Sequence, residues 1–237
     1  MKKLLCAMKP FIQEISHDFM LIACLAMPII MGVVFKFALP ILENVLCVQF
    51  VKTSILSPYY LIFDLLLAIM TPMMFTFVGV MTVLSEMDNG TSKYLCVTPI
   101  GKSGYLLSRI GIPSVIAFFY DALFLSIFSI TDISFLMNIA ISFSSVLLSL
   151  ITSMLVISLA KNKLEGMGLI KMCGFLILGI PAVYFIPSSV KYAFAILPTF
   201  WLTKLAKNEN YIFLLPTILI SLIWISLLSS KFKKKFL

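Results

Sequence analysis

The sequence has few of the residues on which enzymes and disulfide-bonded proteins depend. It contains one histidine and ten acidic residues among 237, and its five cysteines occur singly, with no CxxC pair. A disulfide framework and a zinc site are therefore not predicted, and we expect neither catalytic nor metal-ligating residues. Charged residues make up only 12% of the chain, about half of the usual share in a soluble domain.

Apolar residues are abundant: they make up 61% of the chain, and the mean hydropathy is +1.11. A helix needs about 20 apolar residues to cross about 30 Å of hydrocarbon. Six stretches are long enough, so we predict an all-α integral membrane protein in which residues 1–237 form one transmembrane domain. The predicted spans are residues 19–39, 59–84, 110–130, 133–160, 169–187 and 211–230.

The lysines and arginines lie mainly in alternate gaps between these spans. If the N-terminus is inside, 13 of them are cytoplasmic and 5 are external, which together make the 18 present. The positive-inside rule therefore predicts a multi-pass protein of the cell membrane with both termini in the cytoplasm. The net charge of +8 flanks apolar runs, which indicates anionic lipid as a partner and no nucleic acid.

Two apolar segments do not fit the six-span pattern. Residues 4–19 place apolar side chains on one helical face, which predicts an interfacial helix at the N-terminus. Residues 192–203 are apolar but too short to cross, so we expect a re-entrant segment or an interfacial hairpin before the last span. Residues 40–58 contain polar residues and proline, and are expected to form an external loop.

The longest cytoplasmic gap, residues 85–109, carries the most specific motif in the chain. Residues 86–97 are expected to form a helix that ends at Thr98-Pro99, because the residue before proline avoids helical geometry. The residues that carry the motif are Glu86, Asp88, Gly90, Thr91, Leu95, Thr98 and Pro99.

This motif resembles the loop between the second and third spans of ABC type-two export permeases, a family of bacterial exporter subunits that includes multidrug and lantibiotic permeases. The six predicted spans also fit that family. The resemblance implies that the seven motif residues form a cytoplasmic coupling helix, which docks on a separate ATP-hydrolysing subunit. It further implies a second permease chain, identical or related, that completes the translocation pathway.

The same resemblance implies that this chain binds no cofactor, since ATP and magnesium would sit on the partner. Gly101-Lys102-Ser103 looks like the end of a phosphate-binding loop. That motif needs a glycine five residues before Gly101, where this chain has Cys96. We therefore expect the chain to be a non-catalytic subunit.

Two aspartates fall inside predicted spans. Asp121 lies near the middle of the third span, where an unpaired charge costs about 2.5–3.5 kcal/mol, and Asp64 lies nearer the outer end of the second. Asp121 could line a substrate path or keep the spans in register. It could equally make a structural hydrogen bond to a serine of the fourth span.

Two other classes of function remain open. A non-transport immunity or assembly protein that binds a membrane-active peptide would have the same hydropathy. An intramembrane lipid-modifying enzyme would need clustered acids or histidines, whereas the acids here are scattered. For an exporter, a drug, a peptide and a lipid are all compatible substrates.

Overall fold

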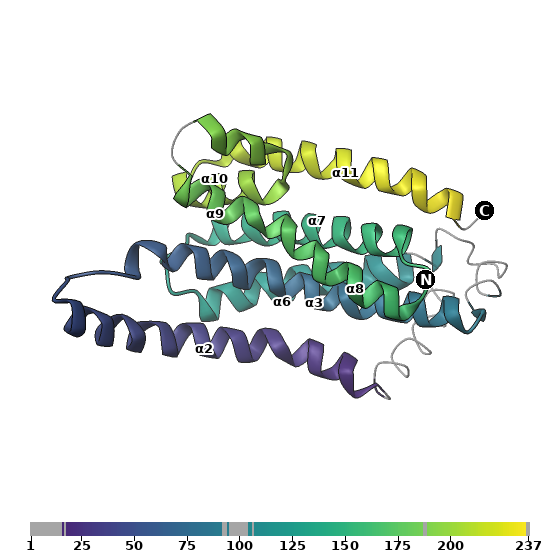
Figure 1. The fold of residues 1–237 in the computed structure, drawn as a ribbon, viewed down its shortest axis with the longest axis horizontal. Coiled ribbons are helices and arrows are strands. Elements are labelled where there is room, and N and C mark those ends of the chain that lie inside the picture. The colour runs from purple at the N-terminus through teal and green to yellow at the C-terminus, as the bar shows by residue number, and fades with distance from the viewer. Residues whose placement is uncertain are drawn as a thin grey trace.

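The structure is a computed structural model that describes residues 16, 18–91, 94, 104, 105, 107–186 and 189–235, with the side chains of 189, 230 and 232–235 excepted. The described part is helical (Figure 1). Six helical segments are long and apolar enough to cross a membrane, as the hydropathy predicted. They are Phe19–Phe50, Ser57–Asp88, Leu107–Phe128, Phe135–Leu159, Lys163–Phe185 and Tyr211–Ser229.

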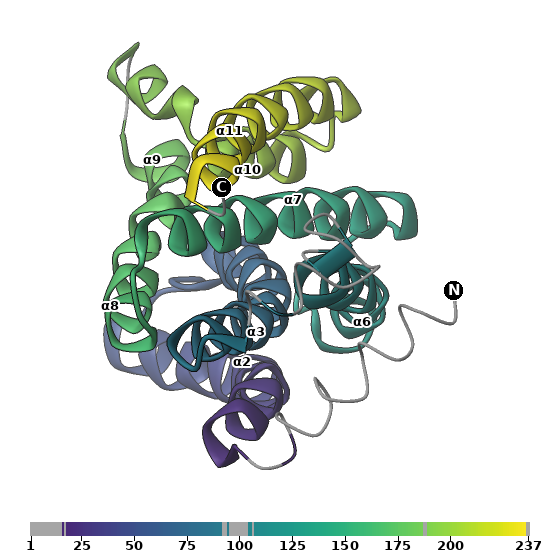
Figure 2. The same ribbon diagram turned by 90° about the vertical axis from the view of Figure 1, so that its right-hand side faces the viewer.

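The helices form two layers on either side of one central helix, α7 (Figure 2). One layer holds the first three spans and α8, and the other holds α9, α10 and α11. The bounds are α2 Phe19–Phe50, α3 Tyr60–Asp88, α6 Ile112–Phe128, α7 Phe135–Leu159, α8 Lys163–Cys173, α9 Gly179–Phe185, α10 Pro198–Asn208 and α11 Leu214–Lys235. In α7, 67% of the most apolar window is buried, against 17% in α2 and α11, which identifies α7 as the core helix.

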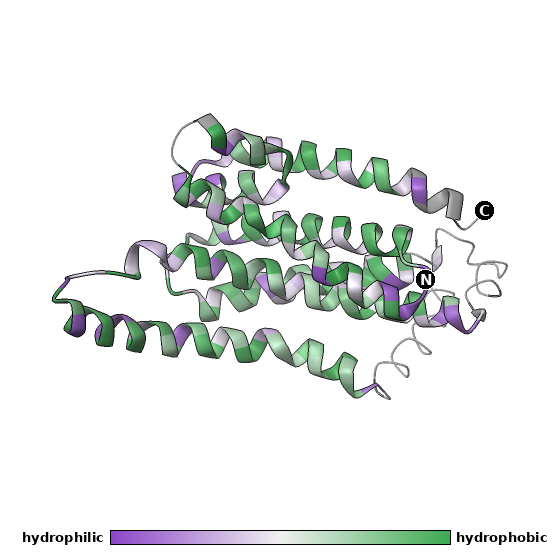
Figure 3. Ribbon diagram, viewed as in Figure 1, coloured by the Kyte–Doolittle hydropathy of each residue, from purple (hydrophilic) through white to green (hydrophobic). Residues whose placement is uncertain are grey.

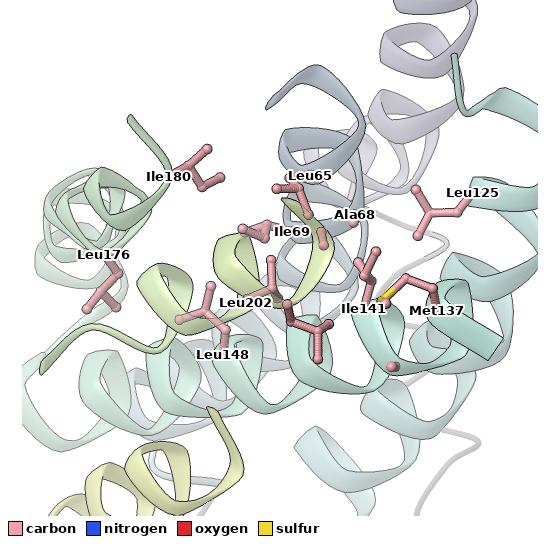
Figure 4. Packing of buried hydrophobic residues seen from close by; sticks show 13 residues of the cluster. Leu65, Ala68, Ile69, Leu125, Met137, Ile141, Leu148, Leu176, Ile180 and Leu202 are labelled. Atoms are coloured by element: carbon pink, nitrogen blue, oxygen red, sulfur yellow. The ribbon is translucent and has the colours of Figure 1, made fainter. Parts of the chain in front are cut away.

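The core consists of aliphatic side chains from both layers that meet on α7. Figure 4 shows Leu65, Ala68 and Ile69 of α3 close to Met137 and Ile141 of α7. Apolar residues also cover the outside of the bundle, and strongly hydrophilic residues concentrate towards the ends of the helices (Figure 3). This distribution is expected of helices surrounded by lipid.

The first span is longer than predicted. α2 continues to Phe50, so residues 40–50, expected in an external loop, are helical. Pro40 lies within α2 without ending it, and apolar residues resume immediately beyond. Glu43, near the end of this helix, accepts hydrogen bonds from the backbone N–H of Ile55 (2.9 Å) and Leu56 (2.6 Å), which fixes the short connection to α3.

The loop after the second span also begins later than predicted. α3 runs to Asp88, and Gly90 adopts a left-handed φ of 72°. The expected continuous helix over residues 86–97 is therefore wrong in its first part. Glu86 lies in the last turn of α3, and the chain turns at Gly90 instead. The third span opens with a π-helical turn, Leu107–Gly111, before α6.

The fifth span is interrupted, and the break precedes Pro181. A 3-10 helix, Gly174–Leu178, separates α8 from α9, and Pro181 lies in the first turn of α9, where its missing N–H is not needed. Residues 192–203 fall in a 3-10 helix, Ser189–Ile196, and the start of α10. At 11 residues, or about 16 Å, α10 is too short to cross the membrane. Its depth in the membrane stays a prediction, and the expected interfacial helix over residues 4–15 lies outside the described residues.

Gly79 of α3 allows the start of the third span to approach closely. A Cβ added at this position would lie 2.1 Å from the carbonyl oxygen of Arg109. Backbone, rather than a flexible side chain, would have to move to make room. The absence of a side chain at Gly79 thus sets the spacing between α3 and the π-helical turn.

We expect Gly79→Ala to lower the free energy of unfolding by about 1–3 kcal/mol, since overpacked sites force the backbone to shift. Thermal unfolding in detergent measures the change. Gly168→Ala is the matched control. It also replaces a glycine within a helix, but the added Cβ meets open space. Equal losses in the two variants would contradict the proposed contact.

Candidate functional site

Glu86, the first acid of the loop motif, faces the interior of the protein. It is 8% exposed, and its Oε1 accepts a hydrogen bond from Arg109 Nη2 at 2.5 Å. Its Oε2 accepts from the hydroxyl of Tyr105 at 2.5 Å and from Arg109 Nε at 3.3 Å. The guanidinium thus contacts both carboxylate oxygens, the geometry in which Arg–carboxylate pairs are strongest.

This cluster joins the last turn of α3 to the first turn of the third span. Arg109 is 1% exposed, so both charges are removed from water. Buried ion pairs add little net stability, but losing one partner leaves an uncompensated charge. In the described structure, Glu86 is thus paired within its own chain, at the other end of the same loop.

Asp88, the second acid, connects α3 to α8. Its Oδ2 accepts from the backbone N–H of Lys163 at 2.9 Å, at the start of α8, where a negative charge is favourable. The Nζ of Lys163 lies 3.1 Å from Oδ2 of Asp18, the residue that caps α2. The ends of α2, α3 and α8 are therefore linked by polar contacts.

Asp18 also accepts from the backbone N–H of Met20. Partial burial tends to raise the pKa of Asp18, but the hydrogen bond and charge of Lys163 and the backbone donors outweigh it. The pKa of Asp18 is lowered from its ordinary value of 3.8. Asp18 is therefore charged at neutral pH and can hold Lys163.

The described residues that follow Asp88 in this loop are exposed or border open space. Thr91 is exposed, Tyr94 is 78% exposed, and a Cβ added at Gly90 would meet open space. Leu95, Thr98 and Pro99 lie outside the described residues. The motif thus divides into an acid that faces inward and a turn that is open to a partner.

Asp64 lies at the opposite end of α3 and closes the turn between α6 and α7. Its carboxylate accepts from the backbone N–H of Ile130 at 3.0 Å and of Thr131 at 2.9 Å, and from the hydroxyl of Thr131. The two backbone N–H groups lie beyond the end of α6, where no helical carbonyl is available to accept from them. Asp64 therefore has a structural role in the described contacts.

Asp121 lies in the interior of the bundle and is fully buried. Neither of its carboxyl oxygens has an aligned hydrogen-bond partner in the described structure. The hydroxyls of Thr71 on α3 and Ser142 on α7 approach it. Its position facing the helices rather than lipid is as expected for a polar group in a span.

An apolar cavity of about 420 Å³ lies between α2, α3, α7 and α8. Methionines form much of its wall, with a few hydroxyl groups and Lys171 beside them. Ligand pockets usually measure about 300–1,000 Å³ and combine apolar walls with a few polar groups. The main lining residues are Met70, Met73, Met74, Phe77, Met167 and Ile170.

Histidine, cysteine, aspartate and glutamate side chains do not gather in threes anywhere in the described ranges. Those ranges thus offer no set of ligands for a metal ion.

Comparison with known proteins places the chain in a family. Residues 11–229 match the family model described as "Fluoroquinolones export permease protein Rv2686c-like". The chain belongs to this family of export permeases. The resemblance to ABC type-two export permeases is confirmed by this match and by the relatives described next.

Two curated relatives are fluoroquinolones export permease proteins of Mycobacterium tuberculosis, from strains CDC 1551 and H37Rv. Each is 31% identical to this permease over 124 residues, which is 52% of this chain and 49% of the relative. The chain therefore spans about half the length of the curated relatives it matches. No solved structure matches it.

Sequence reasoning missed two parts of the site. The partners of Glu86 were not identified, although Arg109 ends the same loop and is the only arginine in the sequence. The cavity was not predicted either. Met70, Met73 and Met74 share one helical face, which could have indicated a methionine-lined surface.

We expect Glu86→Ala to lower the free energy of unfolding of this permease by about 3–5 kcal/mol, because the buried Arg109 would lose the carboxylate that faces it. Thermal unfolding in detergent measures the loss. Asp88→Ala is the control; it removes one exposed hydrogen bond and should cost about 1 kcal/mol. Adding Arg109→Leu to Glu86→Ala should recover part of the stability, and a further loss would argue against a dominant ion pair.

Proposed function

We propose that this permease is the transmembrane subunit of an ATP-driven exporter. Two such chains would form the pathway, and separate ATPase subunits, which carry ATP and magnesium, would bind at the end that holds Glu86. The family match and the six spans support the transport role. We place the protein in the cell membrane with both termini in the cytoplasm.

The observation that carries the coupling role is the Glu86–Arg109–Tyr105 cluster beneath the exposed turn at Gly90. The cluster ties Glu86, at the end of α3, to Tyr105 and Arg109, at the start of the third span. A force applied to the turn would pass to α3 and, through Arg109, to the third span. Asp88 would pass it to α8 as well.

Charge at the Glu86 end supports the proposed orientation. Arg109, Lys161, Lys163 and Lys171 all lie in segments at or near this end, and the motif turn shares it. Exposed lysines here would also meet the anionic lipids of the inner leaflet, at about 1 kcal/mol each.

The cavity supports a substrate of moderate size, apolar with an acidic group. A volume of about 420 Å³ suits a fused-ring drug, methionines adapt to flat aromatic surfaces, and Lys171 could pair with a carboxylate. The curated relatives are named as fluoroquinolone exporters. We therefore propose aromatic acids of the fluoroquinolone type as substrates, ahead of the peptides and lipids that the sequence left open.

We expect Tyr94→Ala to weaken association with the ATPase, because an exposed tyrosine at a docking surface often contributes 2 kcal/mol or more, about 30-fold in affinity. Co-purification of the ATPase and drug export in vesicles measure the effect. Membrane insertion should be unchanged, since Tyr94 is outside the core.

Tyr211→Ala is the matched control: this tyrosine is 47% exposed and opens the last span at the opposite end. It should leave ATPase association unchanged. Full ATPase binding and export by the Tyr94 variant would contradict the proposed docking surface. Export from vesicles lacking any ATPase would contradict the ATP-driven mechanism.

We expect Gly174→Leu to fill part of the cavity and to reduce fluoroquinolone binding at least tenfold, the equivalent of about 1.4 kcal/mol. A Cβ at this cavity-lining glycine meets open space, so the change should not disturb packing. Binding to the purified permease, followed by drug fluorescence, measures it.

Gly168→Leu is the matched control, because Gly168 also has open space but does not line the cavity. Its binding should equal that of the wild type. Equal loss in both variants would place the drug elsewhere. Turnover of lipid by the purified chain would instead favour the lipid-modifying enzyme. If the chain bound a peptide but no drug, an immunity protein would be favoured.

A further inference from the structure

The two aspartates within the spans differ in the direction of the hydrogen bonds around them. Asp64 faces donors: two backbone N–H groups and the hydroxyl of Thr131. An ionised carboxylate only accepts hydrogen bonds, so it satisfies all three donors. The surroundings of Asp64 therefore suit the charged form.

The surroundings of Asp121 are different, because neither of its carboxyl oxygens receives an aligned hydrogen bond from the hydroxyls that approach it. The hydroxyl of Thr71 donates to the carbonyl oxygen of Leu67 at 2.8 Å. The hydroxyl of Ser142 donates to Oδ1 of Asn138 at 3.4 Å. A hydroxyl has one hydrogen and two lone pairs, so with these bonds made each can accept a hydrogen bond from the carboxyl of Asp121.

Charge does not compensate for this arrangement. The ion pairs of the described part join Arg109 to Glu86 and Lys163 to Asp18, and neither includes Asp121. With the hydroxyls bonded as above, an ionised carboxylate would receive no donor from them and would lack solvation, at a cost of several kcal/mol. A protonated carboxyl can donate a hydrogen bond to one of them.

We propose that Asp121 is a proton-binding site in the membrane interior, a neutral carboxylic acid that donates a hydrogen bond to Thr71 or Ser142. It is a positioning residue, which holds α6 against α3 and α7 without burying a charge. The bond depends on a dry junction: movement of α6 that admitted water would favour release of the proton. This inference does not depend on the proposed substrate or on the ATPase.

Infrared difference spectroscopy on the full chain in lipid at neutral pH tests the protonation state. Subtracting the spectrum of Asp121→Asn from that of the wild type should leave the C=O stretching band of a protonated carboxyl, above the amide I band. Asp64→Asn, the matched control, should leave that band in place. If the band is missing from the wild type, or is lost in the Asp64 variant instead, the proposal is overturned.

The unfolding temperature of Asp121 variants tests whether this residue donates a hydrogen bond or only fills space. Asp121→Asn keeps a donor, so its unfolding temperature should stay within about 2–4 °C of the wild type, whereas Asp121→Leu should fall further. An equal loss in both variants would overturn the donor role.

A further variant keeps the test decisive if neither substitution at Asp121 folds. Combining Thr71→Val with Ser142→Ala removes both acceptors while retaining the aspartate. The carboxyl band should then move to higher frequency, because the acid no longer donates a hydrogen bond. An unchanged frequency would overturn the proposed bond.

Discussion

The lack of water in the hydrocarbon governs where polar groups occur in this protein. Hydroxyls within the spans mostly donate to carbonyls one turn back in the same helix, as Ser144 does to Ala140 and Ser153 to Ser149. Such hydroxyls carry little force between helices. Polar links between helices occur mainly near the ends of the bundle, where Glu86 binds Arg109 and Asp64 binds the turn after α6. Between those ends the helices meet mainly through apolar packing on α7, where Asp121 is the polar group that we propose to join α6 to α3 and α7.

That arrangement explains how one loop can act on a whole bundle. Glu86 and Asp88 are two residues apart on α3, yet they contact different spans. Glu86 binds Arg109 at the start of the third span, and Asp88 binds Lys163 at the start of the fifth. Gly90 then turns the chain outward. The acids that the family resemblance associates with a partner subunit instead attach the turn at Gly90, the proposed contact point, to the spans.

Hydropathy predicted the six spans because lipid imposes a minimum apolar length on every crossing, and the fourth span was correct to within two residues at each end. It could not predict that α2 continues through Pro40, since a proline in a long apolar helix is tolerated when neighbouring contacts compensate. The pairing of Glu86 with Arg109 joins residues 23 apart across a loop, beyond any local periodicity. The cavity arises from the space left between four helices, which no single segment encodes.

The length of α2 has a consequence for the opposite face of the protein. Its 32 residues measure about 48 Å, against about 26 Å for the 17 residues of α6. Helix tilts rarely exceed 40°, so a hydrocarbon layer of about 30 Å cannot contain α2. In the proposed orientation, with the Glu86 end in the cytoplasm, the tip of the α2–α3 hairpin would lie beyond the hydrocarbon on the outer side, in line with its extension past the other helices in Figure 1. That tip, fastened by Glu43, would then be a part of the permease that an antibody or a protease can reach at the cell surface.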